Sequence, residues 1–172
     1  MKRVILAICL AVLSVSAYAQ EGGKFAAGVS AVYGTEIAKM GVGVKAQYYF
    51  NEHIRGELGF NIFAKNEPWS TWDVNLNFHY LANIAKNRLF VYPLAGFSLA
   101  QWKMTSIPTG EITEEGTSYS SDENKSFKMG PNLGVGVQVN ITPKTAITAE
   151  ARYQMVGQFD QGLFGIGIQQ RF

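Results

Sequence analysis

Short segments that alternate apolar and polar residues limit this chain's fold more than any other feature. Residues 72–80, Trp-Asp-Val-Asn-Leu-Asn-Phe-His-Tyr, place apolar and polar side chains on opposite faces, and residues 54–62 and 147–155 repeat the pattern. A period of two indicates β-strands. Because a tilted strand needs about 9 to 11 residues to cross a membrane, these segments are long enough to span one.

The alternation recurs along the chain and predicts an all-β fold with eight strands. We expect them near residues 24–33, 40–50, 54–64, 71–81, 89–102, 126–139, 145–156 and 162–172. The connections at 51–53 and 140–144 are short, whereas the connection at 103–125 is long. In an up-and-down barrel this even strand number puts both termini on the side of the short turns, which is the periplasmic side in outer-membrane barrels. The connection at 82–88 is longer than most periplasmic turns.

The first residues are typical of a secretory signal peptide. Lys2 and Arg3 precede an apolar run, and Ala17-Tyr18-Ala19 forms a small-residue cleavage site. The run is too short for a membrane-spanning helix, which needs roughly 20 residues. We therefore expect a signal peptide at residues 1–19 and one β-barrel domain at 20–172.

Composition excludes several functional classes. The whole chain has 15 Lys and Arg against 13 Asp and Glu, so removal of Lys2 and Arg3 with the signal peptide would balance the charges. A neutral chain does not favour nucleic acid. Cys9, the single cysteine, would also be removed, which excludes disulfides and thiolate metal sites. Charged residues make up 16% of the chain, against about 25% in typical soluble domains. We expect no cofactor and no metal.

The composition of the two faces favours lipid on the apolar side. The polar face is rich in glycine, as a narrow interior requires, and carries little Lys or Glu for a water-exposed surface. Aromatic residues gather near the expected strand ends and predict two interfacial girdles. The periplasmic girdle would contain Tyr48, Phe50, Tyr80, Phe90 and Phe172, and the outer one Tyr33, Trp69, Trp72 and Trp102.

The last strand carries a family resemblance. It ends Gly165-Ile-Gly-Ile-Gln-Gln-Arg-Phe172, with Phe164, Ile166, Ile168 and Phe172 on one face. With the Ala17-Tyr18-Ala19 ending and the strand number, this resembles small eight-stranded outer-membrane barrels of the OmpA/OmpX type, a porin-like group of the Gram-negative cell envelope. Gln170 is a departure from this resemblance, because such terminal strands usually carry an aromatic or aliphatic residue at this position on the lipid side. The resemblance implies residence in the outer membrane among lipids and lipopolysaccharide, and recognition of these four residues by the barrel-assembly machinery.

Ionisable residues on the polar face are candidates for an interior network. By parity Lys45, Arg55, Glu57, Asp73, Glu150 and Arg152 point inward, and the expected turn near 51–52 favours a Lys45–Glu57 pair. Eight strands enclose a space that side chains just fill. We expect these side chains to form ion pairs and hydrogen bonds that stabilise a filled interior. We expect the protein to be a monomer with a structural or surface-interaction role. A narrow porin-like channel remains the alternative.

The sequence fits two other functions less well. A lipid-modifying enzyme needs a nucleophile, a base and an acid near the outer leaflet, but His53 and His79 fall near the periplasmic rim. We therefore expect no enzyme. A soluble lipocalin-like carrier would require an apolar interior. The acidic connection at 103–125 is either a solvated loop or a site for cations, for lipopolysaccharide phosphates or for a host or phage partner.

Overall fold

The computed structural model describes residues 24–64, 69–86, 88–105, 109–113, 116–120, 123–157 and 160–172. Of these residues, none belongs to a helix long and apolar enough to cross a membrane. Their strands are β1 (Phe25–Gly34), β2 (Lys39–Tyr49), β3 (Ile54–Phe63), β4 (Trp69–Tyr80), β5 (Ala82–Ala85), β6 (Leu89–Thr105), β7 (Thr109–Thr113), β8 (Gly116–Ser120), β9 (Glu123–Asn140), β10 (Thr145–Gln154) and β11 (Gln161–Arg171).

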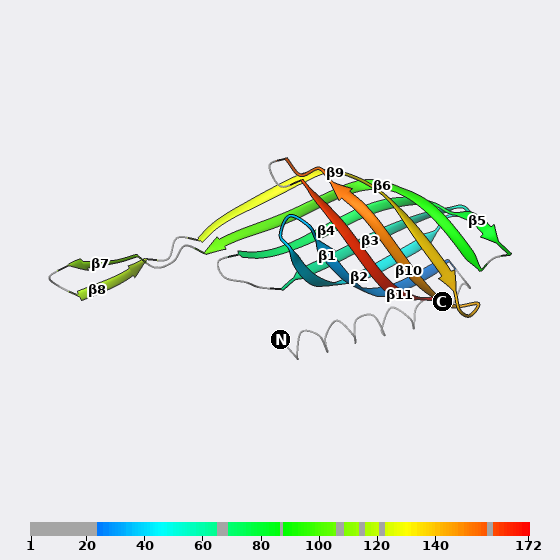
Figure 1. Cartoon of the computed structure of the whole chain (residues 1–172), viewed down its shortest axis with the longest axis horizontal. Helices are drawn as coiled ribbons and strands as arrows, with labels where there is room; N and C mark the ends of the chain where they lie inside the picture. The colour runs from blue at the N-terminus through cyan, green and yellow to red at the C-terminus, as the bar shows by residue number, and fades with distance from the viewer. Residues whose placement is uncertain are drawn as a thin grey trace.

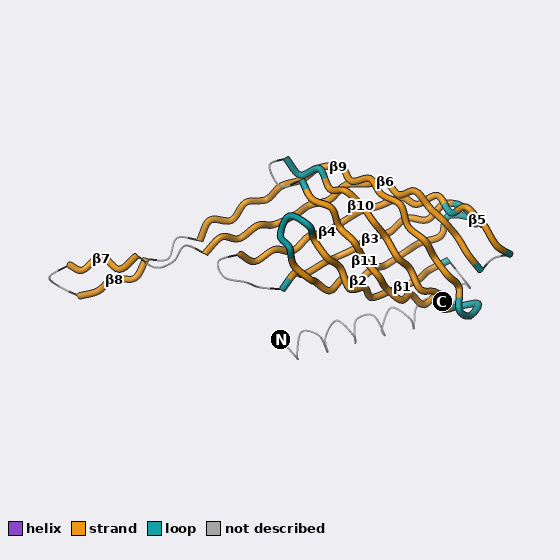
Figure 2. The backbone as a smooth tube through the Cα atoms, in the orientation of Figure 1, coloured by secondary structure: helices purple, strands orange, loops and turns teal. Residues whose placement is uncertain are grey.

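Eight of these strands close into one antiparallel barrel. Each pairs with its neighbour in the order β1, β2, β3, β4, β6, β9, β10, β11, and β11 pairs back onto β1. Figures 1 and 2 show the strands running obliquely around the barrel. The expected closed, eight-stranded, all-β fold is confirmed. Closure leaves none of these eight strands as a free sheet edge.

The two ends of the barrel differ. One end, here called the turn end, carries β5, the turns at 50–53 and 141–144, and the last residue, whose backbone N–H donates to the Phe25 carbonyl at 2.9 Å. The opposite end is called the loop end. In Figure 1, β5 and the β7–β8 hairpin lie at opposite extremes of the molecule.

The connection expected at 82–88 contains a strand instead. The pairing of β4 with β6 reaches His79 opposite Leu94, and β5 resumes the same register with Ala82 opposite Val91. β5 therefore prolongs β4 after an interruption at residues 80–81. Pro93 lies opposite that interruption, where its missing N–H removes no ladder bond. The register of β6 with β9 is unbroken across Pro93.

The connection at 103–125 is also more regular than a loop. The pairing of β6 with β9 continues to Thr105 opposite Glu123, and β7 and β8 form a two-stranded sheet of their own. The strand end expected at residue 102 and the strand start expected at residue 126 were therefore wrong by three residues each, because β6 ends at Thr105 and β9 begins at Glu123. The side chains of Glu111, Glu114, Glu115, Asp122 and Glu123 lie outside the described part of the chain.

The barrel presents its apolar residues outward and its polar residues inward. Many large apolar side chains are exposed on the outer face, among them Val42, Leu76 and Ile166. Near the turn end an aromatic row faces outward, with ring centroids 4.9 Å apart for Phe25 and Tyr48 and 5.0 Å apart for Tyr48 and Phe50.

Nearer the loop end, Trp72 contacts Phe60 and Phe127, with ring centroids 5.9 and 6.2 Å away. The side chains of Trp69 and Trp102 are outside the described part of the chain. Phe90 does not join the girdle expected at the turn end, because it packs inward against a buried cluster that includes Tyr92.

Glycine makes room where the interior is most crowded. A Cβ added to Gly136 would clash with the Tyr92 ring. At Gly165 the nearest atom to such a Cβ is 3.5 Å away, on Val32. Both glycines lie opposite Glu150, on the two strands that flank β10. Only Gly136 faces a large aromatic side chain.

Candidate functional site in the barrel interior

Two carboxylates and one lysine form the centre of the interior. The Lys45 Nζ lies 2.7 Å from the Glu150 Oε2 and 3.7 Å from the Glu57 Oε2. Gln47, opposite Glu57 in the β2–β3 register, donates to the same Glu57 oxygen at 2.7 Å. The three charged side chains come from β2, β3 and β10, so this contact crosses the barrel. The Lys45 ammonium group thus forms ion pairs with two buried carboxylates at once.

Arg55 forms the next level toward the turn end. Its Nε and Nη2 lie 3.1 and 2.7 Å from the His79 Nδ1, and its Nη1 donates to the Gln138 Oε1 at 2.7 Å. The guanidinium also lies 4.8 Å from the centre of the Tyr92 ring, which stacks on His79 at 4.9 Å. Tyr92 donates its hydroxyl to Glu150 at 2.8 Å. We call Lys45, Arg55, Glu57, His79, Tyr92 and Glu150 the charged cluster.

Within the described residues, Glu57, His79 and Glu150 are the group whose ligand atoms come close enough for a metal ion, within 4.8 Å of one another. Because a guanidinium has only donors, the His79 Nδ1 must accept from Arg55, and the lone pair on that nitrogen is occupied. Lys45 already supplies the positive charge between the carboxylates. The three side chains therefore fit an internal ion-pair network better than a metal centre.

Toward the loop end the interior is built from amides. Asp73 accepts from Asn61 at 2.7 Å and from Asn75 at 2.5 Å. The Asn75 carbonyl oxygen accepts from Ser98 and from Gln154, at 2.6 and 2.7 Å. Six strands meet in this amide cluster, whose members are Asn61, Asp73, Asn75, Ser98, Asn132, Gln154 and Gln161.

These two clusters fill the barrel across its width. Arg55, Tyr92, Asn75, Ser98 and Asn132 each expose 0% of their surface, although they come from four different strands. A side chain that lined a water-filled channel would retain accessible surface. At these levels the interior is therefore closed to water.

The sequence comparisons agree with this architecture. The model of the family described as "Outer membrane protein beta-barrel domain" matches residues 5–172. The chain belongs to this family. A search of curated proteins found no match to this chain.

Solved structures show the same fold at low sequence identity. The N-terminal barrel domain of OprF from Pseudomonas aeruginosa is 16% identical, with a TM-score of 0.62 over 87% of this chain and 99% of that one. Ail, the attachment invasion locus protein of Yersinia pestis, is 18% identical, with a TM-score of 0.62 over 89% and 100% of the two chains. Neisserial surface protein A is 14% identical, with a TM-score of 0.63 over 88% and 98%. These similarities concern the fold.

The structure brings most of the predicted interior residues of this outer-membrane barrel together. Lys45, Glu57 and Glu150 are in contact, with Arg55 one level away. Asp73 lies apart from them in the amide cluster. Arg152 is buried, and its Nη1 has no hydrogen-bond partner among the described atoms.

The remaining predicted positions lie at the two chain ends. Phe164, Ile166 and Ile168 are exposed on the outer face of β11. Phe172 directly follows that strand. Ala17 and Ala19 are outside the described residues, so cleavage after Ala19 stays a prediction.

Sequence reasoning missed the inward aromatic residues. Tyr49 accepts from Arg55 at 3.1 Å and Tyr92 bridges His79 and Glu150. The available signal was parity, because Tyr92 shares its face with Phe90 and Leu94 rather than with Val91.

Proposed function

We propose that this protein is a closed, monomeric outer-membrane barrel with a structural or surface-interaction role, without enzymatic activity, and not a diffusion pore. The complete burial of inward side chains from β3, β4, β6 and β9 carries the proposal. Family membership supports residence in the outer membrane. The exposed apolar face and its aromatic rows suit contact with lipid and lipopolysaccharide.

Planar-bilayer recordings on the folded protein test the closed interior. Folding is first checked by gel mobility with and without boiling. We expect no stable unit conductance, whereas a general porin added to the same bilayer serves as the positive control. A reproducible unit conductance from the heat-modifiable form would contradict the proposal and favour the narrow-channel alternative.

The surface role is assigned to the segment at 103–125. It is the longest connection, its β6–β9 pairing extends beyond the other loop-end pairings, and its sequence has five acidic residues against Lys103 and Lys125. Ail has been solved with the heparin analogue sucrose octasulfate, a polyanion. The opposite charge here favours a cationic partner, with divalent cations as the simplest case.

Replacing residues 109–120 by a short Gly-Ser linker tests this assignment. The variant should keep its heat-modifiable mobility, because the register of the barrel does not include β7 or β8. Calorimetric titration with CaCl₂ and MgCl₂ should show weaker binding to the variant than to the full chain. Equal binding, or no binding to either, would exclude the cation role.

A further inference from the structure

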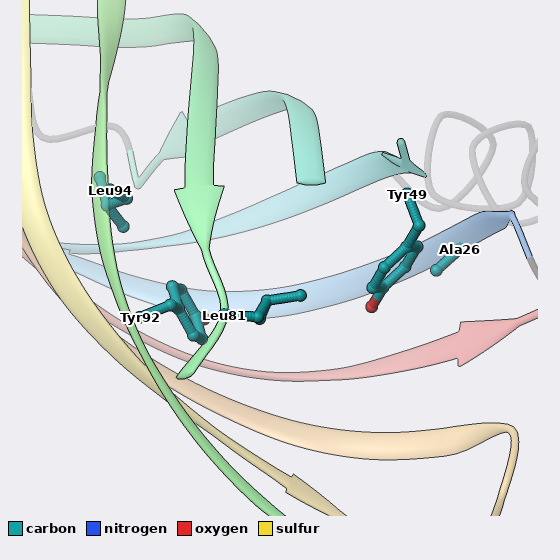
Figure 3. Close-up of a cluster of buried hydrophobic side chains, with 5 residues drawn as sticks. All are labelled: Ala26, Tyr49, Leu81, Tyr92 and Leu94. Atoms are coloured by element: carbon teal, nitrogen blue, oxygen red, sulfur yellow. The ribbon is translucent and has the colours of Figure 1, made fainter. Parts of the chain in front are cut away.

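A cavity of about 780 Å³ opens at the turn end of the barrel. Its wall includes the turn after β2, the strand β5, the start of β6 and the end of β11. Tyr49 and Gln138 line it and also contact Arg55, so the charged cluster lies directly behind them. Figure 3 shows Tyr49 and Leu81, two of its lining residues, within the buried cluster at this end. Its volume lies in the range of small-molecule sites.

The cavity is lined by basic side chains that make no ion pair within the described part of the chain. Lys24, Arg88, Arg171 and His53 contribute to the lining, and Glu52 is the single acidic side chain among the described lining residues. In the described part of the chain, Lys24, Arg88 and Arg171 make no ion pair with a carboxylate. Because low-dielectric walls focus the field of such charges, the cavity has a positive potential.

Arg171 is held in place before any ligand binds. Its guanidinium lies 4.0 Å from the centre of the Tyr49 ring, and the Tyr49 hydroxyl accepts from Gln169 at 3.2 Å and from Arg55 at 3.1 Å. A guanidinium has five N–H donors, so the contact with Tyr49 leaves donors for a ligand. A planar fork of donors that is already oriented suits the oxygens of a phosphate.

Apolar groups complete the lining. Leu81 belongs to the buried cluster and Phe90 packs against it, whereas Phe50 and Ile141 are exposed. We propose that this cavity binds phosphate-bearing anions from the periplasmic side, with the cations holding the phosphate and the apolar wall holding an attached carbon chain. Its periplasmic orientation rests on the proposed function, but binding itself does not.

The test is a phosphorus NMR titration of the folded full-length barrel in neutral maltoside micelles without phosphate buffer. The probes are inorganic phosphate and dihexanoylphosphatidylglycerol. The variant is Lys24→Gln with Arg88→Gln, because both side chains line the cavity and both are exposed. The matched control is Lys144→Gln, an exposed cation at the same end that does not line the cavity.

We expect saturable binding of at least one probe, weakened about tenfold in the double variant and less than about twofold in Lys144→Gln. Binding should also weaken between 50 and 500 mM salt, since the Debye length shortens roughly threefold. Preference for the phosphatidylglycerol would identify a lipid head group, and equal binding a free phosphate. Absence of saturable binding, or equal losses in both variants, overturns the proposal. A closed barrel without conductance would be unaffected by that failure.

Discussion

Glu57→Gln is the sharpest perturbation of the charged cluster. Glu57 is 2% exposed and its Oε2 lies 3.7 Å from the Lys45 Nζ. Glutamine keeps the shape of the side chain and can still accept from Gln47. The substitution therefore removes one charge from a buried network with little change in packing.

The size of the effect follows from these contacts. A charge pair at 3.7 Å is worth about 4 kcal/mol at an effective dielectric constant of about 20. Part of this is regained, because a buried carboxylate no longer has to be desolvated. Lys45 also keeps Glu150 at 2.7 Å. We expect a net loss of about 2–3 kcal/mol in the free energy of unfolding.

Urea denaturation followed by tryptophan fluorescence measures this loss. With a slope of about 2 kcal/mol per molar urea, the midpoint should fall by about 1–1.5 M. Unfolding and refolding curves must coincide for the comparison to hold. Glu36→Gln, in the exposed turn after β1, is the control and should change the free energy by less than about 0.5 kcal/mol. An unchanged midpoint for Glu57→Gln would refute the idea that the pair stabilises the barrel.

Three further predictions concern packing, export and assembly. Gly136→Ala should lower the free energy of unfolding by about 1–3 kcal/mol through its clash with Tyr92, while Gly165→Ala should stay near wild type in the same urea assay. Mass spectrometry should find the amino terminus directly after Ala19, and Ala19→Arg should accumulate the longer precursor. Deleting Phe172 should reduce heat-modifiable protein in cells far more than it lowers the urea midpoint of the refolded barrel; equal losses would contradict a role in assembly.

The strands were predictable because alternation is a local property. In β4 every second residue from Trp72 is apolar and every other one is polar, so the sequence alone assigns both faces. β6 was harder, because its turn-end half is apolar on both faces. Its position near a strand end predicted a girdle role for Phe90, but Phe90 shares its face with Tyr92 and packs inward.

The interior pairs were predictable only between neighbouring strands. Glu57 comes near Lys45 through the hairpin of β2 and β3, whose register follows from a short turn. Glu150 reaches Lys45 from β10, across the lumen. That contact depends on how the closed barrel staggers its strands, which no local pattern encodes. The sequence did not predict the amide cluster around Asn75, because its contacts across the lumen also depend on the stagger of the strands.

Sharing of Lys45 between two carboxylates has a measurable consequence. In Glu57→Gln the lysine retains Glu150, and in Glu150→Gln it retains Glu57, so each single variant leaves the ammonium paired. The double variant leaves no carboxylate within ion-pair distance of Lys45 among the described residues. An unpaired buried charge is far more costly than a weakened pair.

We therefore expect the loss in the double variant to exceed the sum of the single losses by at least about 1 kcal/mol. Adding Lys45→Met, which removes the orphaned charge and keeps the volume, should recover most of that excess. Additive losses would mean that the two carboxylates act independently. The charged cluster would then be three separate interactions rather than one cooperative unit closing the barrel.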